Sequence, residues 1–564
     1  MKRPLVYLLI MLLVTGTGCG WLFGFHREVH NPKKKGRYPR FSKEEKLRGE
    51  RSPLRDCYDV TCNELHVSVD PLKKYLKGKV KIDASAVSAF EVLQVDLYPN
   101  MRANSITFNG SPAKYERKHG AIFITAPQKI KAGERFSIEV AYEGEPLPAR
   151  RPPWDGGFVW KKDKQLNDWI GVACQTEGAS LWWPCKDENS DEADSTLINI
   201  TVPAGLFCVS NGQFRGIDSL SSKTEHTYRW FVSYPINNYN VTLYIGKYRH
   251  LSDSYKSPVT GKTLALNHYV LPWNYTMAQK HFQQLKDHLA FFEKTFGEYP
   301  FYRDGFKLVE SPYAGMEHQT AIAYGNGYKN DFNGWFDYII LHETAHEWWG
   351  NSLSASDLAH VWLQEGFATY SEALYVEHIQ GKNAYLDYLY WQRMTIKNKR
   401  PLIGPMGRKY FSYKDGDVYM KGAWTLHTLR SVIADDPLFF DIIKTFHVEN
   451  SMKQVTSDAF IALVNKKTGK DYSWFFKQYL SKRKAPFIEY CYAGGKLYYR
   501  WKNTDSDFVM PVELVTGNGK RTMIYPTAKV QAMTLPDGVS EFAFNDRIML
   551  FGSRENKSLK RKAD

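Results

Sequence analysis

Hydrophobic and polar residues alternate along the first half of the chain. Between about residue 60 and residue 270 the period is two, as in Leu65, Val67 and Val69, and no long helical pattern interrupts it. A period of two places successive side chains on opposite faces of a strand. The pattern therefore predicts an all-β domain over residues 53–270.

The period then changes to three and four residues, which predicts helices with one buried face. The apolar positions of the first helical stretch are Phe282, Leu285, Leu289, Phe292 and Phe296. Pro486 ends the helical pattern, and short strand-like runs such as Leu497–Trp501 and Val509–Val515 follow it. We therefore expect a mainly helical domain over residues 271–485 and a small β-sandwich with a basic tail over residues 486–564.

The first nineteen residues have the pattern of an export signal. Lys2 and Arg3 precede an apolar run, Leu5–Val14, that is too short to span a membrane comfortably. Small residues then lead to Cys19, an arrangement that resembles a bacterial lipoprotein signal, although Gly16 stands where leucine is usual. We expect an exported protein of the cell envelope, in the periplasm or on the outer surface, with a lipid anchor at Cys19. Ordinary cleavage or a retained anchor is the alternative.

Composition narrows the functional classes. Residues 20–52 are rich in charge and poor in apolar side chains, which predicts a flexible linker. The net charge is +15, but no zinc-finger or RNA-binding signature accompanies it, so we expect a solvated surface and no nucleic-acid partner.

Six cysteines remain besides Cys19. They could be buried hydrophobes, or Cys57 and Cys62 could close a short disulfide loop.

The sequence HETAHEWWGN, which begins at His342, carries the strongest chemical signal. His342 and His346 are four positions apart, so a helix places both imidazoles on one face, where they can hold one zinc ion. Glu343 lies between them and is placed to take a proton from a water at the metal. Catalytic zinc usually has three protein ligands, and Glu365 is the natural candidate for the third. We expect one Zn²⁺ per chain.

Eighteen residues separate His346 from Glu365, and GFATY follows the glutamate. This arrangement resembles the gluzincin aminopeptidases, the family of aminopeptidase N and leukotriene hydrolase. The resemblance implies a multidomain α+β fold: an N-terminal β-saddle, a thermolysin-like catalytic domain and a small C-terminal β-sandwich. The chain resembles a short bacterial form of the family, which implies no large C-terminal helical domain. Glu372 lies on the same helical face as Glu365 and could orient a zinc-bound histidine.

Two further motifs resemble segments with which the family binds the amino terminus of its substrate. In CQTEGASLWWPCKDENSDEADS, which begins at residue 174, Gln175 matches the residue that holds the free amine. In AGMEH, which begins at residue 314, Gly315 and Met316 would pair with an extended peptide as a strand edge does. Glu317 would then pair with the ammonium group.

The second motif departs from the family's GxMEN at two positions. Ala314 and His318 stand where glycine and asparagine are usual. These departures leave the details of specificity open while Glu317 is retained.

The segment VYMKGAWTLHTLR, which begins at residue 418, resembles the family's Y-x-KGA motif. The resemblance makes Tyr419 the donor of a hydrogen bond to the oxyanion of the tetrahedral intermediate. The function implied is a zinc aminopeptidase, which we expect to be monomeric and to act on peptides with a free N-terminus.

Two alternatives are compatible with the fold. The chain could be a zinc hydrolase that acts on something other than peptides, or a non-catalytic binding protein of the cell surface. The presence of Glu343 and of all three expected zinc ligands favours an enzyme. The presence of Gln175, Glu317 and Tyr419 favours the aminopeptidase.

Overall fold

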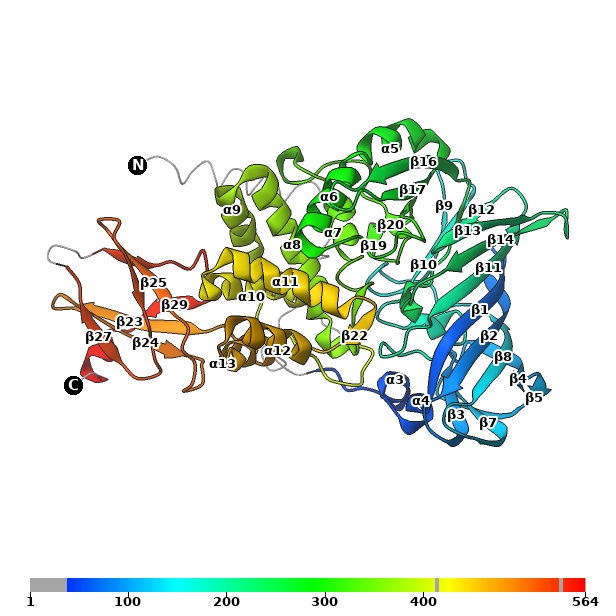
Figure 1. Cartoon of the computed structure of the whole chain (residues 1–564), viewed down its shortest axis with the longest axis horizontal. Coiled ribbons are helices and arrows are strands. Elements are labelled where there is room, and N and C mark those ends of the chain that lie inside the picture. The colour runs from blue at the N-terminus through cyan, green and yellow to red at the C-terminus, as the bar shows by residue number, and fades with distance from the viewer. Residues whose placement is uncertain (1–37, 411–414, 537–540, 563–564) are drawn as a thin grey trace.

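A computed structural model of the chain describes residues 38–410, 415–536 and 541–562. Three units follow one another along an elongated molecule (Figure 1). A β-rich unit occupies one end, helices form the middle, and a smaller β unit occupies the other end. The order of β-rich, helical and small β units agrees with the order predicted from the hydrophobic pattern.

An eight-stranded sheet forms the body of the β-rich unit. Its strands in spatial order are β13 (Gln213–Asp218), β14 (Glu225–Val232), β11 (Ser195–Pro203), β1 (Tyr58–Asp70), β2 (Tyr75–Ala86), β8 (Arg135–Gly144), β4 (Met101–Phe108) and β5 (Ser111–Pro112). Leu65, Val67 and Val69 of β1 are buried, as their alternation predicts. The parallel pairing of β1 with β11 places Ile198 beside Leu65, so both strands supply the same core.

Two smaller sheets complete the β-rich unit. One has the order β12 (Phe207–Val209), β15 (Tyr244–Gly246), β10 (Asp168–Ala173) and β9 (Gly157–Lys162), and the other has the order β3 (Phe90–Asp96), β7 (Ala121–Ile130) and β6 (Lys114–Lys118). The long loop that follows β10 carries Gln175 toward the helical unit.

The hairpin of β16 (Arg249–Lys256) and β17 (Thr263–Val270) belongs with the helices. A five-stranded sheet has the order β16, β17, β18 (Leu308–Glu310), β20 (Ile322–Tyr324) and β19 (Gly315–Met316). Leu251 and Leu264 of the hairpin lie in the same core as the helices, because its apolar face packs against them. The predicted boundary at residue 270 is therefore wrong, since the helical unit begins before β16.

Helices build most of the middle unit. They are α5 (Tyr275–His281), α6 (Gln284–Phe296), α7 (Tyr338–Ala345), α8 (Trp362–Gln380), α9 (Lys382–Arg393), α10 (Asp417–Ile433), α11 (Asp436–Asn450), α12 (Ser457–Thr468) and α13 (Ser473–Phe476), with a short sheet of β21 (Leu353–Ala355) and β22 (Lys453–Val455). Helices α8 and α10 touch through their backbones: a Cβ atom on Gly366 would lie 2.9 Å from the Cα atom of Gly422. Glycine at both positions permits this close approach.

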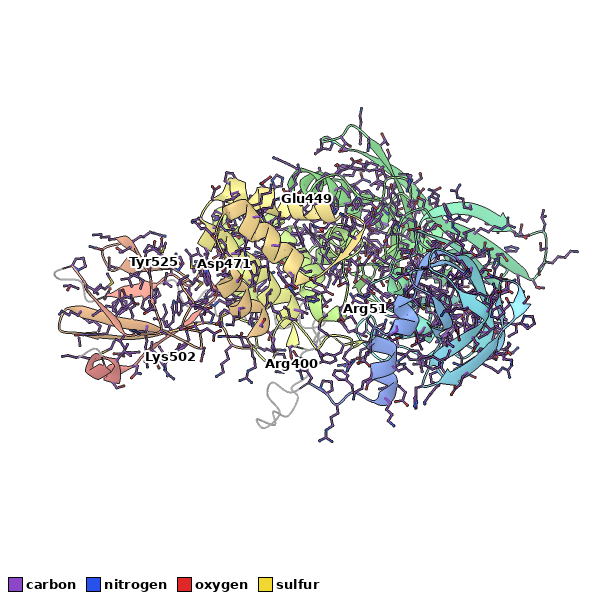
Figure 2. All side chains as sticks on the ribbon, turned by 60° about the horizontal axis from the view of Figure 1, so that its bottom comes forward. Arg51, Arg400, Glu449, Asp471, Lys502 and Tyr525 are labelled. Atoms are coloured by element: carbon purple, nitrogen blue, oxygen red, sulfur yellow. The ribbon has the colours of Figure 1, made fainter. Side chains whose placement is uncertain are left out.

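The C-terminal unit consists of two sheets. One has the order β27 (Gln531–Thr534), β24 (Lys496–Lys502), β23 (Phe487–Ala493) and β29 (Gly552–Glu555), and the other has the order β26 (Arg521–Ile524), β25 (Val512–Thr516) and β28 (Phe542–Phe544). The rings of Tyr490 and Phe544 meet between the sheets at 5.4 Å. Lys502 and Tyr525 mark this unit in Figure 2. Its core is continuous with that of the helices, which includes Ile488.

The segment predicted as a flexible linker, residues 20–52, contains a helix in its described part. Helix α3 (Lys43–Gly49) begins with a capping box in which Ser42 and Glu45 bond reciprocally, and a short helix α4 (Pro53–Asp56) follows. The guanidinium of Arg48 lies 4.2 Å from the ring centre of Tyr98. The prediction is wrong for residues 38–52 because these charged side chains cap and dock the helix rather than only solvating it.

Two further sequence expectations concern export. Cys19 and the predicted signal, residues 1–19, lie outside the described residues. The six described cysteines are all free, so Cys57 and Cys62 do not form the disulfide considered above. Within the described ranges, no helix combines the length and apolar content that crossing a membrane requires.

Candidate metal centre and amine-binding site

Helix α7 presents the two histidines of the HETAH sequence. Its N-cap, Asp337, accepts hydrogen bonds from the backbone N–H groups of Ile339 and Ile340, which satisfies donors that a helix start leaves unpaired. Every residue from Tyr338 to Ala345 is buried. His346 is the C-cap and still has helical dihedral angles, so its imidazole stays on the same face as that of His342.

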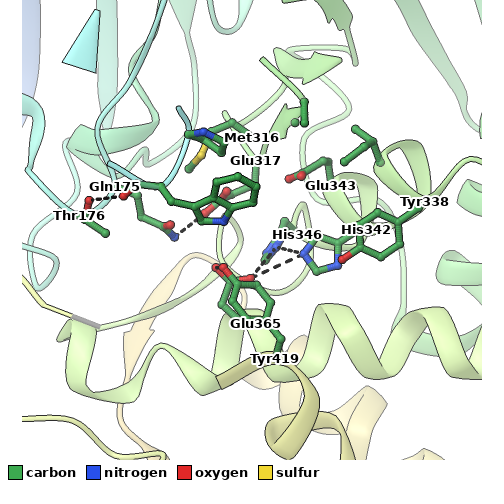
Figure 3. A pocket seen from close by; sticks show the side chains of 15 residues that line it. Gln175, Thr176, Met316, Glu317, Tyr338, His342, Glu343, His346, Glu365 and Tyr419 are labelled. Carbon is green, nitrogen blue, oxygen red and sulfur yellow. Dashed lines mark hydrogen bonds and ion pairs between the residues drawn. The ribbon is translucent and has the colours of Figure 1, made fainter. Parts of the chain in front are cut away.

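Three donor atoms converge in front of α7 (Figure 3). His342 Nε2 lies 3.2 Å from His346 Nε2, and Glu365 Oε2 lies 3.7 Å and 3.4 Å from these two atoms. Tetrahedral zinc with ligand distances of about 2.0–2.1 Å requires donor atoms about 3.4 Å apart. The triad His342, His346 and Glu365 therefore has the spacing of a zinc site.

The protonation of the two rings points to the same conclusion. His342 Nδ1 lies 2.6 Å from Glu372 Oε1, and His346 Nδ1 lies 2.8 Å from the carbonyl oxygen of Trp349. Each Nδ1 faces an acceptor and therefore carries the proton in the neutral ring, which leaves a lone pair on each Nε2. Two lone pairs and a carboxylate that face one point fit a cation. Glu372 thus contacts His342, and its role in orienting a zinc-bound histidine stays a prediction.

Helix α8 supplies Glu365, and helix α10 supplies Tyr419 beside it. The hydroxyl of Tyr419 donates to Glu365 Oε1 at 3.3 Å. Because Gly366 and Gly422 let α8 and α10 approach closely, both side chains reach the same small volume. Tyr419 is also one of the residues that line the cavity in front of the metal triad.

The two predicted acceptors for a substrate amine meet on the opposite side of this cavity, as Figure 3 shows. Gln175 Nε2, from the β-rich unit, donates to Glu317 Oε1 at 2.6 Å. The hydroxyl of Tyr239 donates to the same oxygen at 3.1 Å. Glu317 follows β19 directly, and β19 is the edge strand of its sheet. An extended peptide can therefore add to this edge with its amino terminus near Glu317.

Glu343 lies close to the backbone of this edge strand. A Cβ atom built on Gly315 would lie 2.6 Å from Glu343 Oε1 and 2.9 Å from Cγ2 of Ile339. The glycine is therefore required here by space and not by its backbone angles. The predicted general base is thus held between the metal triad and the strand on which a peptide would lie.

The site concentrates negative charge. Burial raises the pKa of Glu317 and of Glu343, although the neighbouring histidines oppose the shift. Burial also raises the pKa of Glu365, but the adjacent imidazoles of His342 and His346 outweigh it and hold that pKa at about 2. A cluster of buried carboxylates of this kind favours bound cations, both a metal ion and an ammonium group.

The structure shows where the two residues that depart from the family motif, Ala314 and His318, lie. His318 is fully buried, and its Nδ1 lies 2.6 Å from the hydroxyl of Tyr244. Ala314 lines the cavity. Neither departure displaces Glu317, whose backbone carbonyl accepts a hydrogen bond from Asn351 at 2.9 Å.

Sequence reasoning missed several residues of the site, among them Tyr239 and Trp154. Tyr239 touches Glu317 from a 3₁₀ turn, Asn238–Asn240, that no motif marks. Trp154 lines the cavity from a loop before β9. Both come from the β-rich unit, so only the packing of the two units shows their role. His360 and His427 lie near the motifs in sequence, but they are buried and bond to Ser457 and Tyr385.

The fold and the site together resemble one class of protein. A β-rich unit joins a helical unit in which two histidines of one helix and a glutamate of the next converge on one point. This arrangement is similar to that of the gluzincin aminopeptidases, which the spacing of His342, His346 and Glu365 resembles.

Comparison with known proteins agrees with this class. Residues 281–479 match the family model described as "Peptidase family M1 domain". An M1 zinc metallopeptidase from Deinococcus radiodurans has the same fold: the TM-score is 0.64 at 22% identity, over 76% of this chain and 94% of that one.

The curated relatives match this chain over only part of their own length. Leucine aminopeptidase 2 of Neurospora crassa is 23% identical over 352 residues, which cover 59% of this chain and 49% of the relative. Aminopeptidase B of Mus musculus is 20% identical over 426 residues, which cover 71% and 59% respectively. The chain thus spans about half to three fifths of the length of these relatives.

Proposed function

We propose that this chain is a zinc-dependent aminopeptidase that removes the N-terminal residue from peptides with a free amino group. The observation that carries the proposal is the contact of Gln175 and Glu317 at 2.6 Å in the same cavity as the His342, His346 and Glu365 triad. Relatives named leucine aminopeptidase and aminopeptidase B support it.

The metal triad would hold the ion, and the neighbouring side chains would carry out the proton transfers. The chemistry that zinc supplies when bound is polarisation of the scissile carbonyl and a lower pKa for the attacking water. Glu343 takes the proton of that water and passes it to the leaving amine. Tyr419 donates its hydroxyl proton in a hydrogen bond to the developing oxyanion. Both residues line the cavity.

Restriction to chain ends comes from the amine acceptors. Glu317 is buried and follows the edge strand β19, along which the substrate backbone would extend. The carboxylate of Glu317 and the side-chain oxygen of Gln175 accept hydrogen bonds from the ammonium group of the first residue. Cleavage then falls after that residue, because Gly315 and Met316 hold the first peptide bond near the metal triad.

The proposal is tested on fluorogenic aminoacyl amides. The wild-type protein should contain about one equivalent of zinc and should lose activity in a chelator. Glu365→Ala should lose most of the zinc and the activity, whereas Glu343→Gln should keep the zinc and lose only the activity. Hydrolysis that survives complete removal of metal would contradict the proposal. Zinc binding without hydrolysis of any amide would favour the alternatives, a hydrolase of non-peptide substrates or a binding protein.

We also propose that the protein is exported and held at a membrane by a lipid on Cys19, as a monomer. The support is the apolar run and the small residues that precede this cysteine. Cys19→Ser should release the protein into a soluble exported fraction. Retention of this variant in the membrane would show a retained anchor instead. Sedimentation of the released protein should give the mass of one chain.

A further inference from the structure

The turn that carries Gln175 rests on a buried carboxylate, Asp187. The backbone N–H of Gly178 donates to the carbonyl oxygen of Cys174 at 2.7 Å, which closes the turn around Gln175. Gly178 packs directly on Asp187, since a Cβ atom on the glycine would lie 2.2 Å from Asp187 Oδ2. Ser180 donates to the same oxygen from its backbone at 3.1 Å and from its hydroxyl at 2.5 Å. Asp187 therefore fixes the base of the turn.

The other oxygen of Asp187 is bound from the helical unit. Lys409 Nζ lies 2.6 Å from Asp187 Oδ1, and the two side chains are 11% and 2% exposed. Burial raises the pKa of Asp187, but the Lys409 ammonium and the Ser180 hydrogen bonds outweigh burial and lower it, so the carboxylate stays charged. A charge pair with so little exposure is screened weakly by solvent.

The backbone of Lys409 is itself held in place. A Cβ atom on Gly49, the last residue of α3, would lie 2.7 Å from the backbone nitrogen of Lys409. The backbone N–H of Gly407 donates to Asp357 Oδ2 at 2.7 Å. The ammonium of Lys409 therefore reaches Asp187 from a backbone segment that is held by contacts with Gly49 and with Asp357.

We propose that Lys409 is a positioning residue for recognition of the substrate's amino group. It bonds Asp187, Asp187 fixes the turn of residues 174–178, and that turn presents Gln175 to Glu317. This inference rests on the proposed aminopeptidase function. It adds a residue that lies outside every motif found in the sequence and outside the cavity that contains the metal triad.

The argument depends on the way the two units are joined at the site. Gln175 reaches from the β-rich unit to Glu317 of the helical unit, and Lys409 reaches from the helical unit to Asp187 of the β-rich unit. Both contacts cross the boundary between the two units, and both involve the loop that follows β10. Loss of the Lys409 contact leaves Asp187 charged and buried, so the carboxylate must draw in water or move, and Gly178 must move with it.

The test compares Lys409→Met with Lys409→Arg and with Lys409→Met combined with Asp187→Asn, which removes the unpaired charge. Lys467→Met is the matched control, because Lys467 pairs with Asp441 at 2.8 Å on the surface of the helical unit. Each variant is assayed on matched peptides with free and with acetylated amino termini, together with zinc content and melting temperature.

Lys409→Met and the double variant should raise KM for the free peptide about 10-fold, with kcat changed less than about twofold and zinc unchanged. They should also reduce the preference for the free peptide. Lys409→Arg should restore most of the loss, and Lys467→Met should behave as the wild type. In a double-mutant cycle, the effect of Lys409→Met should largely disappear in a Gln175→Ala background.

Two results would overturn the inference: unchanged selectivity in the folded double variant, or effects of Lys409→Met and Gln175→Ala that simply add. A fall in melting temperature without a change in KM would assign Lys409 to stability alone, which also contradicts it. Failure of the aminopeptidase proposal looks different, because the wild type itself would then show no preference for free amino termini.

Discussion

Substitution of Gly315 by alanine tests whether Glu343, the proposed general base, is held by the strand that we propose to bind the peptide. The added Cβ would lie 2.6 Å from Glu343 Oε1 and 2.9 Å from Ile339 Cγ2. Non-bonded heavy atoms settle at about 3.5 Å. Either the carboxylate or the edge strand must therefore move by roughly half an ångström to one ångström.

A displacement of about 1 Å in a reacting group can cost about 100-fold in rate. Gly315→Ala should therefore lower kcat/KM about 10- to 100-fold while zinc content stays at the wild-type value, since Glu343 is not one of the three donors. Gly404→Ala is the matched control, because its Cβ would meet Ala359 Cα at an ordinary 3.4 Å. The assay is hydrolysis of an aminoacyl amide, with zinc and melting temperature measured on the same samples. Activity of Gly315→Ala within about twofold of wild type would refute the placement of Glu343.

Two further predictions concern buried groups near the site. Glu372→Ala removes the acceptor that lies 2.6 Å from His342 Nδ1. It should lower zinc affinity or activity about 10- to 100-fold, as measured by competition with a chelator and by hydrolysis. Wild-type affinity together with wild-type activity would contradict the role of Glu372. Burial lowers the pKa of His318 to about 3. The stability that this neutral ring supports is fully present above its unfolded pKa of about 6.5 and is lost at about 1.4 kcal/mol per pH unit as the pH falls toward 3. Between pH 7 and pH 5, the free energy of unfolding of His318→Asn should therefore fall by about 2 kcal/mol less than that of the wild type. Urea unfolding at both pH values measures this. An equal fall in the two proteins would show that His318 is not buried as a neutral ring.

The metal triad could be predicted because its geometry is local. His342 and His346 occupy one helix face by their spacing alone, and Glu365 follows at a distance that the family resemblance makes recognisable. The order of β-rich and helical units could be predicted because burial on one face imposes a period of two or of three to four residues.

What could not be predicted depends on contacts between distant segments. Tyr239 reaches Glu317 across 78 positions of sequence, and Lys409 reaches Asp187 across 222. The hydrophobic periodicity of a sequence gives no information about such long-range pairs. The hairpin of β16 and β17 was assigned to the wrong unit for a related reason: alternation identifies a strand but not the core on which it packs.

The described part of the segment predicted as a linker was misjudged from composition. Its charges make specific contacts, such as that of Arg48 with Tyr98 and that of Glu50 with Arg408 at 3.4 Å. A charged segment is disordered only when nothing in the fold complements it.

The most direct test of the account compares one peptide in two forms, with a free and with an acetylated amino terminus. Acetylation removes the cation and leaves the Glu317 carboxylate without its partner, at a cost of about 1–3 kcal/mol or more. The wild type should therefore cleave the free peptide about 5- to 150-fold faster, as kcat/KM, and Glu317→Ala should narrow that ratio while it retains zinc. Equal cleavage of the two forms by the wild type would contradict the assignment of Glu317 and Gln175 as the amine site, and with it the aminopeptidase.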